Sequence, residues 1–156
     1  MLDNREEESK MKRIVTGRTA DGRDGIISSG SVDPVAAMPG SRNETRLCWS
    51  TTGAIVVPRD ASEPMPEFTR APQAPGDSRF LLLTFPPGSA TPVHVTPTCD
   101  YVVIVIGELW LIMDDGDECR LEAGDSVVQN GTLHAWENRA DGPCIIAAVM
   151  IGAETG

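Results

Sequence analysis

From residue 79 onward, apolar and polar positions alternate in short blocks that predict β-strands. Runs rich in branched and aromatic residues are separated by clusters of Gly, Pro, Asn and Asp, which favour turns. No stretch has the apolar spacing of an amphipathic helix. Short strands with regular turns are typical of an all-β sandwich or barrel. The predicted strands are 79–85, 91–95, 101–106, 108–113, 118–121, 126–129, 134–138 and 144–151.

The first half of the chain has a weaker pattern. Residues 1–12 are polar and predicted to be disordered, and Met11 is a second candidate for the natural start. Residues 58–78 carry five of the twelve prolines, namely Pro58, Pro64, Pro66, Pro72 and Pro75. Proline lacks an amide donor, so this stretch predicts a surface loop and not an interior strand. Further short strands are predicted at 13–15, 25–28, 47–51 and 53–57.

These patterns divide the chain into parts. We expect residues 13–79 to supply strands and a Pro-rich loop that pack on a barrel core formed by 80–152. In 101–106, side chains of both alternating sets are apolar, which indicates a strand covered on both faces. One face is predicted to line the barrel. Tyr101 is expected on the other face, which would pack on a second sheet or a neighbouring subunit. This excess of apolar residues is compatible with a homodimer, whereas the composition alone would also allow a monomer.

The composition narrows the range of possible binding partners. The 156 residues include 23 acidic and 13 basic side chains, for a formal charge of -10. A nucleic-acid partner needs a basic surface, so none is expected. The four cysteines have no metal-knot or disulfide spacing. The start of the chain has no apolar signal core, and the longest apolar run, 102–106, is too short to cross a bilayer. We therefore expect a cytoplasmic protein that binds no membrane and no nucleotide cofactor.

The only two histidines lie in two ordered motifs. His94 belongs to Pro-Gly-x5-His-x-Thr-x3-Asp-x6-Gly, which runs from residue 87 to 107. His134 belongs to Gly-Asp-x5-Gly-x2-His-x3-Asn, which runs from 124 to 138. These motifs resemble the paired motifs of the cupin family, G-x5-H-x-H-x3-E-x6-G and G-x5-P-x-G-x2-H-x3-N. The resemblance covers about residues 80–150 and is closest to a bacterial and fungal subgroup, some of whose members are called oxidoreductases.

The resemblance implies a double-stranded β-helix, or jelly-roll, barrel with one metal ion inside. In the family pattern three histidines and a glutamate hold that metal. Here the outer two histidines match, whereas Thr96 replaces the middle histidine and Asp100 replaces the glutamate. Gln129 also stands where the second motif has proline. Cupins host many chemistries, so the motifs predict the fold more sharply than the function.

One hypothesis is a metal site. His94, Thr96 and Asp100 are separated by even numbers of residues, so on an extended segment their side chains point to the same side, and His134 would face them from another strand. Two histidines and a carboxylate can hold a divalent metal such as Fe, Zn, Mn or Ni and leave open positions. In this hypothesis His94, Asp100 and His134 are both the ligands and the catalytic residues. Thr96 and Trp136 would bind substrate, with Thr96 holding a water and Trp136 forming an aromatic wall.

Two alternatives remain open. His94 and His134 form a metal-free pair in which Asp100 orients an imidazole for acid–base work. Alternatively, His134 is a structural, hydrogen-bonded residue. The leading function is a small-molecule enzyme with metal-dependent oxidoreductase, dioxygenase-like, lyase or isomerase chemistry. The alternatives are a metal-free dehydratase, decarboxylase or isomerase, and a cupin that binds a small molecule without turnover.

One acidic stretch and one asparagine receive structural predictions. The acidic stretch 114–117 lacks the spacing of a calcium-binding loop, so we expect a hairpin turn there. Asn138 ends the second motif, and we expect its side chain to hold the loop backbone.

Overall fold

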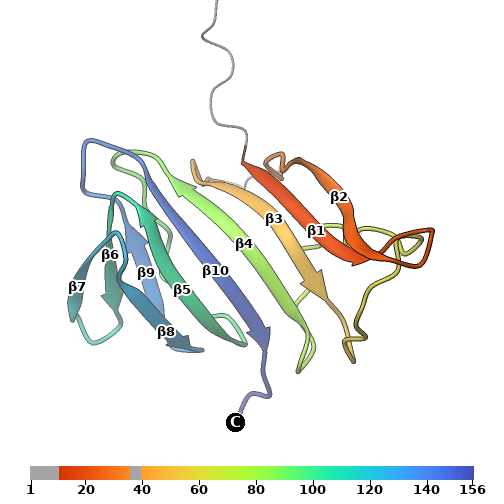
Figure 1. Ribbon diagram of the computed structural model, residues 1–156. Coiled ribbons are helices and arrows are strands. Elements are labelled where there is room, and N and C mark those ends of the chain that lie inside the picture. Colours follow the sequence, from red (N-terminus) through yellow and green to blue (C-terminus); the bar gives the residue numbers. More distant parts are fainter. Residues whose placement is uncertain (1–10, 36–39) are drawn as a thin grey trace, which may run out of the picture.

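The computed structural model describes residues 11–35 and 40–156 (Figure 1). These residues form ten β-strands and no helix. One sheet has the order β3-β4-β10-β5-β8, a second has the order β7-β6-β9, and β1 and β2 form a separate hairpin. The strands are β1 (Lys12–Arg18), β2 (Asp24–Ser31), β3 (Glu44–Thr51), β4 (Ser78–Phe85), β5 (Thr98–Ile106), β6 (Glu108–Met113), β7 (Glu118–Glu122), β8 (Ser126–Asn130), β9 (His134–Glu137) and β10 (Cys144–Gly152).

The all-β barrel prediction is confirmed, and seven of its eight C-terminal strands are observed as β4 to β10. The exception is 91–95, which forms no regular strand. Isolated bridges join Ala90 to Glu137 and His94 to His134 of β9, and the Thr91 amide donates to the Trp136 carbonyl at 2.9 Å. Pro92 has no amide to donate, so it interrupts the ladder within this segment.

In the N-terminal half, the strand predicted at 53–57 is wrong. Gly53 has a positive φ of 65° and the following apolar residues lie in an exposed loop. Their branched side chains favour a strand, but within the part of the chain that the structure describes they pair with no strand. The Pro-rich stretch is a loop up to β4, as predicted. Residues 1–10 of the predicted disordered start lie outside the described residues, and β1 begins at Lys12.

The core lies between the two larger sheets. Alternate residues of β5 point inward, where Val102 and Ile104 are 5% and 1% exposed. They pack with Leu109 of β6 and Ile146 of β10 in one apolar cluster. Gly107 makes the turn from β5 to β6 with a φ of 80°, and a Cβ there would lie 2.5 Å from the Pro143 carbonyl oxygen. A side chain would therefore collide with backbone at the point where the chain changes sheets.

The N-terminal half contributes to the barrel through one strand. β3 pairs with β4 and so extends the five-stranded sheet. Figure 1 shows the β1–β2 hairpin beyond β3, on the side away from β6 and β7. The loop 52–77 joins this hairpin, because the Arg18 amide donates to the Arg59 carbonyl at 2.6 Å. Gly17 permits this approach, since a Cβ there would lie 2.4 Å from the same oxygen. We call the hairpin and the loop 52–77 together the overhang.

Candidate functional site

The two histidines face each other across a backbone bridge. His94 lies on the segment before β5, and His134 is the first residue of β9. Their backbones exchange hydrogen bonds of 2.9 and 3.0 Å. Residues paired in this way project their side chains to the same side. The ring centroids are accordingly 4.4 Å apart, with the planes tilted by 51°. The structure therefore brings together two residues that are forty positions apart in the sequence.

Hydrogen bonds fix which nitrogen of each ring is available. The Nδ1 atom of His94 lies 2.9 Å from the Pro92 carbonyl oxygen, and that of His134 lies 2.8 Å from the Thr132 carbonyl oxygen. A carbonyl oxygen only accepts, so each Nδ1 carries the proton. In the neutral rings, the lone pair therefore lies on Nε2. His134 is 2% exposed, whereas His94 is partly exposed. The pair thus presents two basic nitrogens, one buried and one reachable from solvent.

Asp100 adds a buried carboxyl group from β5. Its residue is 7% exposed, and a chain of hydroxyls leads to it. The Thr98 hydroxyl donates to the Thr96 hydroxyl oxygen at 2.9 Å, and the Thr96 hydroxyl donates to Asp100 Oδ2 at a long 3.5 Å. The other oxygen, Oδ1, is buried and has no partner. A buried acceptor without a donor costs free energy, so this atom is a place where a ligand gains by supplying a donor.

Burial changes the proton affinities at the site. Desolvation raises the pKa of Asp100, while the hydroxyls of Thr98 and Thr96 and the two imidazoles act in the opposite direction. Desolvation lowers the pKa of His134, as does the positive charge that His94 can carry. The Thr132 carbonyl and Asp100 partly offset that decrease. Neutral pH therefore favours an unprotonated His134, which is the state that can accept a proton.

The predicted three-ligand metal site is not assembled. Within residues 11–35 and 40–156, no three His, Cys, Asp or Glu side chains come together as a set that could hold a metal ion. The two imidazoles meet, but Asp100 is directed to Thr96 and does not complete the set. Asp has one methylene less than the glutamate of the family pattern, and a hydroxyl stands in place of the third imidazole. The donor set present therefore does not fit the metal that the resemblance implies.

The remaining predicted residues have mixed outcomes. Thr96 lies in the site, but as a link between Thr98 and Asp100. Trp136 is 6% exposed and contacts the His134 ring edge-on, with centroids 5.8 Å apart. Trp136 also belongs to the apolar core cluster, so the same side chain borders the site and packs in the core. Tyr101 is 53% exposed on the outer face, as its parity predicted.

Asn138 and the acidic turn also behave as predicted. The Asn138 amide donates to the Phe85 and Gly142 carbonyls at 2.8 and 2.9 Å. Its side-chain oxygen accepts from the Ala140 amide at 3.0 Å. The stretch 114–117 is the turn of the antiparallel β6–β7 hairpin.

Sequence reasoning missed two buried polar residues. Thr98 is 4% exposed and Gln129 is 3% exposed. Gln129 lies opposite Asp100 in the β5–β8 register and accepts a 2.6 Å hydrogen bond from the Thr132 hydroxyl. The sequence contained a feature that could have identified each of these two residues. Thr98 shares parity with Asp100, and Gln129 occupies the position where the family pattern has an apolar proline.

Comparisons with known proteins agree with this architecture. The family model described as "Cupin domain" matches residues 81–151. Two proteins of Diaporthe leptostromiformis, named phomopsin biosynthesis cluster proteins C' and D, are each 31% identical over 134 residues, which is 82% of this chain and 70% of theirs. A cupin-domain-containing oxidoreductase of Aspergillus ruber is 28% identical over 135 residues, which is 83% of this chain and 65% of that protein.

Two solved structures share the fold. A cupin-2 domain protein of Rhodospirillum rubrum has a TM-score of 0.56 at 13% identity and covers 80% of this chain and 72% of its own. The polyketide cyclase RemF of Streptomyces resistomycificus has a TM-score of 0.54 at 15% identity, with 77% and 73% covered. Fold and site together define a small antiparallel barrel with a polar cluster inside. The chain belongs to the cupin superfamily.

The relatives support a cupin enzyme or a small-molecule binder. Within residues 11–35 and 40–156 there is no helix that could serve as a membrane span.

Proposed function

We propose that the chain is an enzyme that acts on a small organic molecule at the His94–His134 pair by proton transfer. The observation that carries this proposal is the shared orientation of two imidazoles whose Nδ1 atoms are both bound to carbonyls. Each ring then offers a lone pair on Nε2, at a centroid separation of 4.4 Å. A neutral imidazole is a common general base.

The residues take separate roles in this proposal. His134 is buried and held neutral, so its Nε2 accepts a proton from a carbon next to a substrate carbonyl. The electron pair of that C–H bond moves toward the carbonyl oxygen, and return of the proton to another atom completes an isomerisation with no change in oxidation state. His94 is partly exposed, so solvent and substrate can reach its ring. Asp100 Oδ1, which has no partner, accepts a hydrogen bond from a substrate hydroxyl.

Deuterium exchange tests the proposal without a known substrate. Metal-stripped protein is incubated in D2O with a panel of small β-hydroxycarbonyl and 1,3-dicarbonyl compounds, and NMR follows loss of the C–H signals. We expect catalysed exchange or conversion of at least one compound, reduced about 100-fold or more in His134→Gln. Equal rates in the variant and the wild type, or activity only after metal addition, would contradict the proposal.

Oxidoreductase function is the second candidate, and the printed name of the Aspergillus ruber relative favours it. Elemental analysis of protein purified without chelators separates the two. About one bound metal per chain, lost in His134→Gln, would favour the oxidoreductase over the proton-transfer enzyme.

A further inference from the structure

A cleft lies between the overhang and the outer face of the five-stranded sheet. Its volume is about 1050 Å³, and neither His94 nor His134 lines it. On the sheet side the cleft is lined by Trp49 of β3 and Phe80 of β4, which are opposite each other in the register of the two strands. Small-molecule sites have volumes of roughly 300 to 1000 Å³, so this cleft is large enough to hold an organic ligand and the water around it.

An irregularity in β3 joins the sheet to the overhang at this cleft. The β3–β4 register shifts between Leu47 and Trp49, so Cys48 has no partner on β4. A bulge of this kind bends its strand and changes the direction of the neighbouring side chains. The Cys48 carbonyl accepts a 3.2 Å hydrogen bond from Nη1 of Arg13 in β1. This contact places the Arg13 guanidinium beside the Trp49 ring, 5.9 Å from its centroid.

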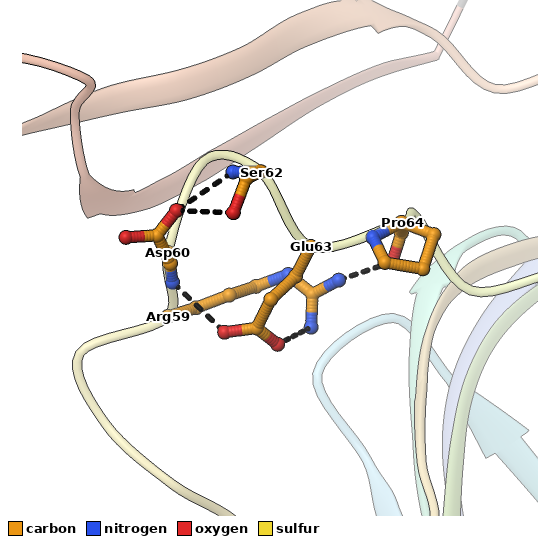
Figure 2. A network of polar contacts seen from close by, with 5 residues as sticks. All are labelled: Arg59, Asp60, Ser62, Glu63 and Pro64. Atoms are coloured by element: carbon orange, nitrogen blue, oxygen red, sulfur yellow. Dashed lines mark hydrogen bonds and ion pairs between the residues drawn. The ribbon is translucent and has the colours of Figure 1, made fainter.

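A polar network holds the loop side of the cleft in place. Figure 2 shows Arg59 donating to the Glu63 carboxylate at 3.0 Å and to the Pro64 carbonyl. The other oxygen of Glu63 accepts from the Asp60 amide at 2.9 Å. The Arg59 guanidinium also lies over the Trp49 ring, 5.0 Å from its centroid. The loop is therefore tied to β3 without a ligand, which lowers the ordering cost that a ligand would have to offset.

One positive charge in the cleft has no carboxylate partner. Three arginines line the cleft, and two of them form ion pairs: Arg18 with Asp24 at 3.3 Å and Arg59 with Glu63 at 3.0 Å. The third, Arg13, is half-buried and forms no ion pair within residues 11–35 and 40–156. Its charge is therefore available to a ligand that enters the cleft.

The chemistry of Arg13 favours a carboxylate. A guanidinium presents five N–H donors in a planar fork, and the Cys48 carbonyl is the one acceptor that Arg13 has among the described residues. Two parallel hydrogen bonds to a carboxylate match the fork. Glu67 also lines the cleft, but its side chain is exposed, so water screens its charge. The formal charge of -10 opposes non-specific binding of anions, so a bound carboxylate would depend on this local contact.

The remaining lining of the cleft is largely apolar. Ile55, Val57 and Phe80 line it although they are 67, 80 and 40% exposed. Pro58 and Pro66 add further apolar surface. An apolar ligand body that covers these side chains removes their surface from water, which stabilises the complex. The cleft therefore combines one available cation with an apolar lining.

We propose that this cleft is a second binding site, which takes a small apolar carboxylic acid. The carboxylate of the ligand binds the Arg13 guanidinium. Its apolar body lies between the apolar side chains of the overhang and the Trp49–Phe80 pair of the sheet. The site is separate from the histidine pair, so this proposal does not depend on the reaction proposed there.

Two-dimensional ¹H–¹⁵N NMR of the full chain tests the proposal, with 3-phenylpropionate as the probe and 3-phenylpropionamide as its uncharged match. The chain has three tryptophans, whose indole N–H signals report on different places. Trp49 reports on the cleft, Trp136 on the histidine site and Trp110 on its contact with Arg139. We expect the acid to shift the Trp49 signal with a Kd of about 1 mM or below. The amide should bind at least 10-fold more weakly.

A pair of variants tests the role of Arg13. Arg13→Gln removes the charge, so we expect the Kd for the acid to rise at least 10-fold. The matched control is Arg42→Gln, because Arg42 also donates to a backbone carbonyl, that of Pro87, at 3.2 Å, but does not line the cleft. The control should bind the acid as tightly as the wild type. If Arg13→Gln does not fold, the comparison of acid and amide on the wild type still decides the question.

Several outcomes would overturn the proposal. One is a Trp49 signal that does not shift at about 10 mM acid, tenfold above the expected Kd. Others are equal affinities for the acid and the amide, or a folded Arg13→Gln that binds the acid as tightly as the wild type. A shift of Trp136 in place of Trp49 would assign the acid to the histidine site and would also overturn it.

Discussion

The two faces of the five-stranded sheet invert the usual distribution of side chains. On β5, Asp100 points inward and is 7% exposed, whereas its neighbour Tyr101 points outward and is 53% exposed. The inner face has polar groups at one end, including Gln129 opposite Asp100, and a dry apolar cluster at the other. The outer face has apolar groups that water can reach. A fold that only had to be stable would place these two sets the other way round.

We propose that the difference reflects separate roles for the two faces of the sheet. Buried polar atoms without partners and exposed apolar patches both cost free energy in an isolated chain. The inner polar end is small and lies beside two histidines, which suits a small molecule. The outer face is broad and apolar over β4, β5, β8 and β10, which suits contact with another surface. The predictions below change one face at a time.

The largest expected effect compares two neighbouring positions on β5. Val102→Glu puts a carboxylate into the core, where Val102 is 5% exposed, and we expect a loss of about 4 kcal/mol or more in the free energy of unfolding. Val103→Glu makes the same change on the outer face, and we expect a folded chain. Thermal melts followed by circular dichroism measure both. Equal destabilisation of the two variants would show that the faces do not differ.

The second prediction rebuilds the family donor set on the inner face. Thr96→His combined with Asp100→Glu supplies the third imidazole and the longer carboxylate. We expect the affinity for Zn²⁺ to rise by roughly 100-fold or more over the wild type, because a four-ligand site replaces a pair of imidazoles. Isothermal titration calorimetry measures it, with Thr96→His alone as the control. Tight binding of one Zn²⁺ by the wild type would contradict the account of the site.

The third prediction concerns the buried carboxyl. Because burial raises the Asp100 pKa above 3.8, the folded chain holds a proton that the unfolded chain releases, and stability is lost as pH rises through that interval. Asp100→Asn avoids this loss. We expect the variant to be more stable near neutral pH by about 1 to 3 kcal/mol, with the gain vanishing as the pH approaches 3.8.

Urea unfolding across this pH range measures the difference between the two chains. The lowered pKa of His134 reduces stability as pH falls below 6.5, but it does so in both chains and largely cancels in the comparison. A gain that is constant with pH would show that Asp100 is not the titrating group.

Part of the fold and part of the candidate site could be predicted from the sequence. The alternation in 101–106 assigned Tyr101 to the outer face, and the two motifs brought His94 and His134 to one site. Other features depend on contacts between distant residues. Nothing local shows that Arg59 approaches Gly17 and Arg18, so the contact between the Pro-rich loop and the two N-terminal strands was not predicted. The segment 91–95 alternates like a strand, but Pro92 removes an amide that a strand would need.

Among the described residues, the three predicted metal ligands are not brought together as one set, for a related reason. Parity correctly placed Thr96 and Asp100 on one side of the chain, but it could not show that their side chains bind each other. That contact depends on rotamers and on the hydroxyl of Thr98.

The most direct test of the central claim is long-range ¹H–¹⁵N NMR of the histidine rings, which are only two in the chain. The account predicts that both rings are protonated at Nδ1, that the His134 ring is neutral near neutral pH with its Nε2 free, and that one equivalent of Zn²⁺ does not saturate the pair. Protonation of His134 at Nε2, or stoichiometric capture of the metal by both Nε2 atoms, would contradict it.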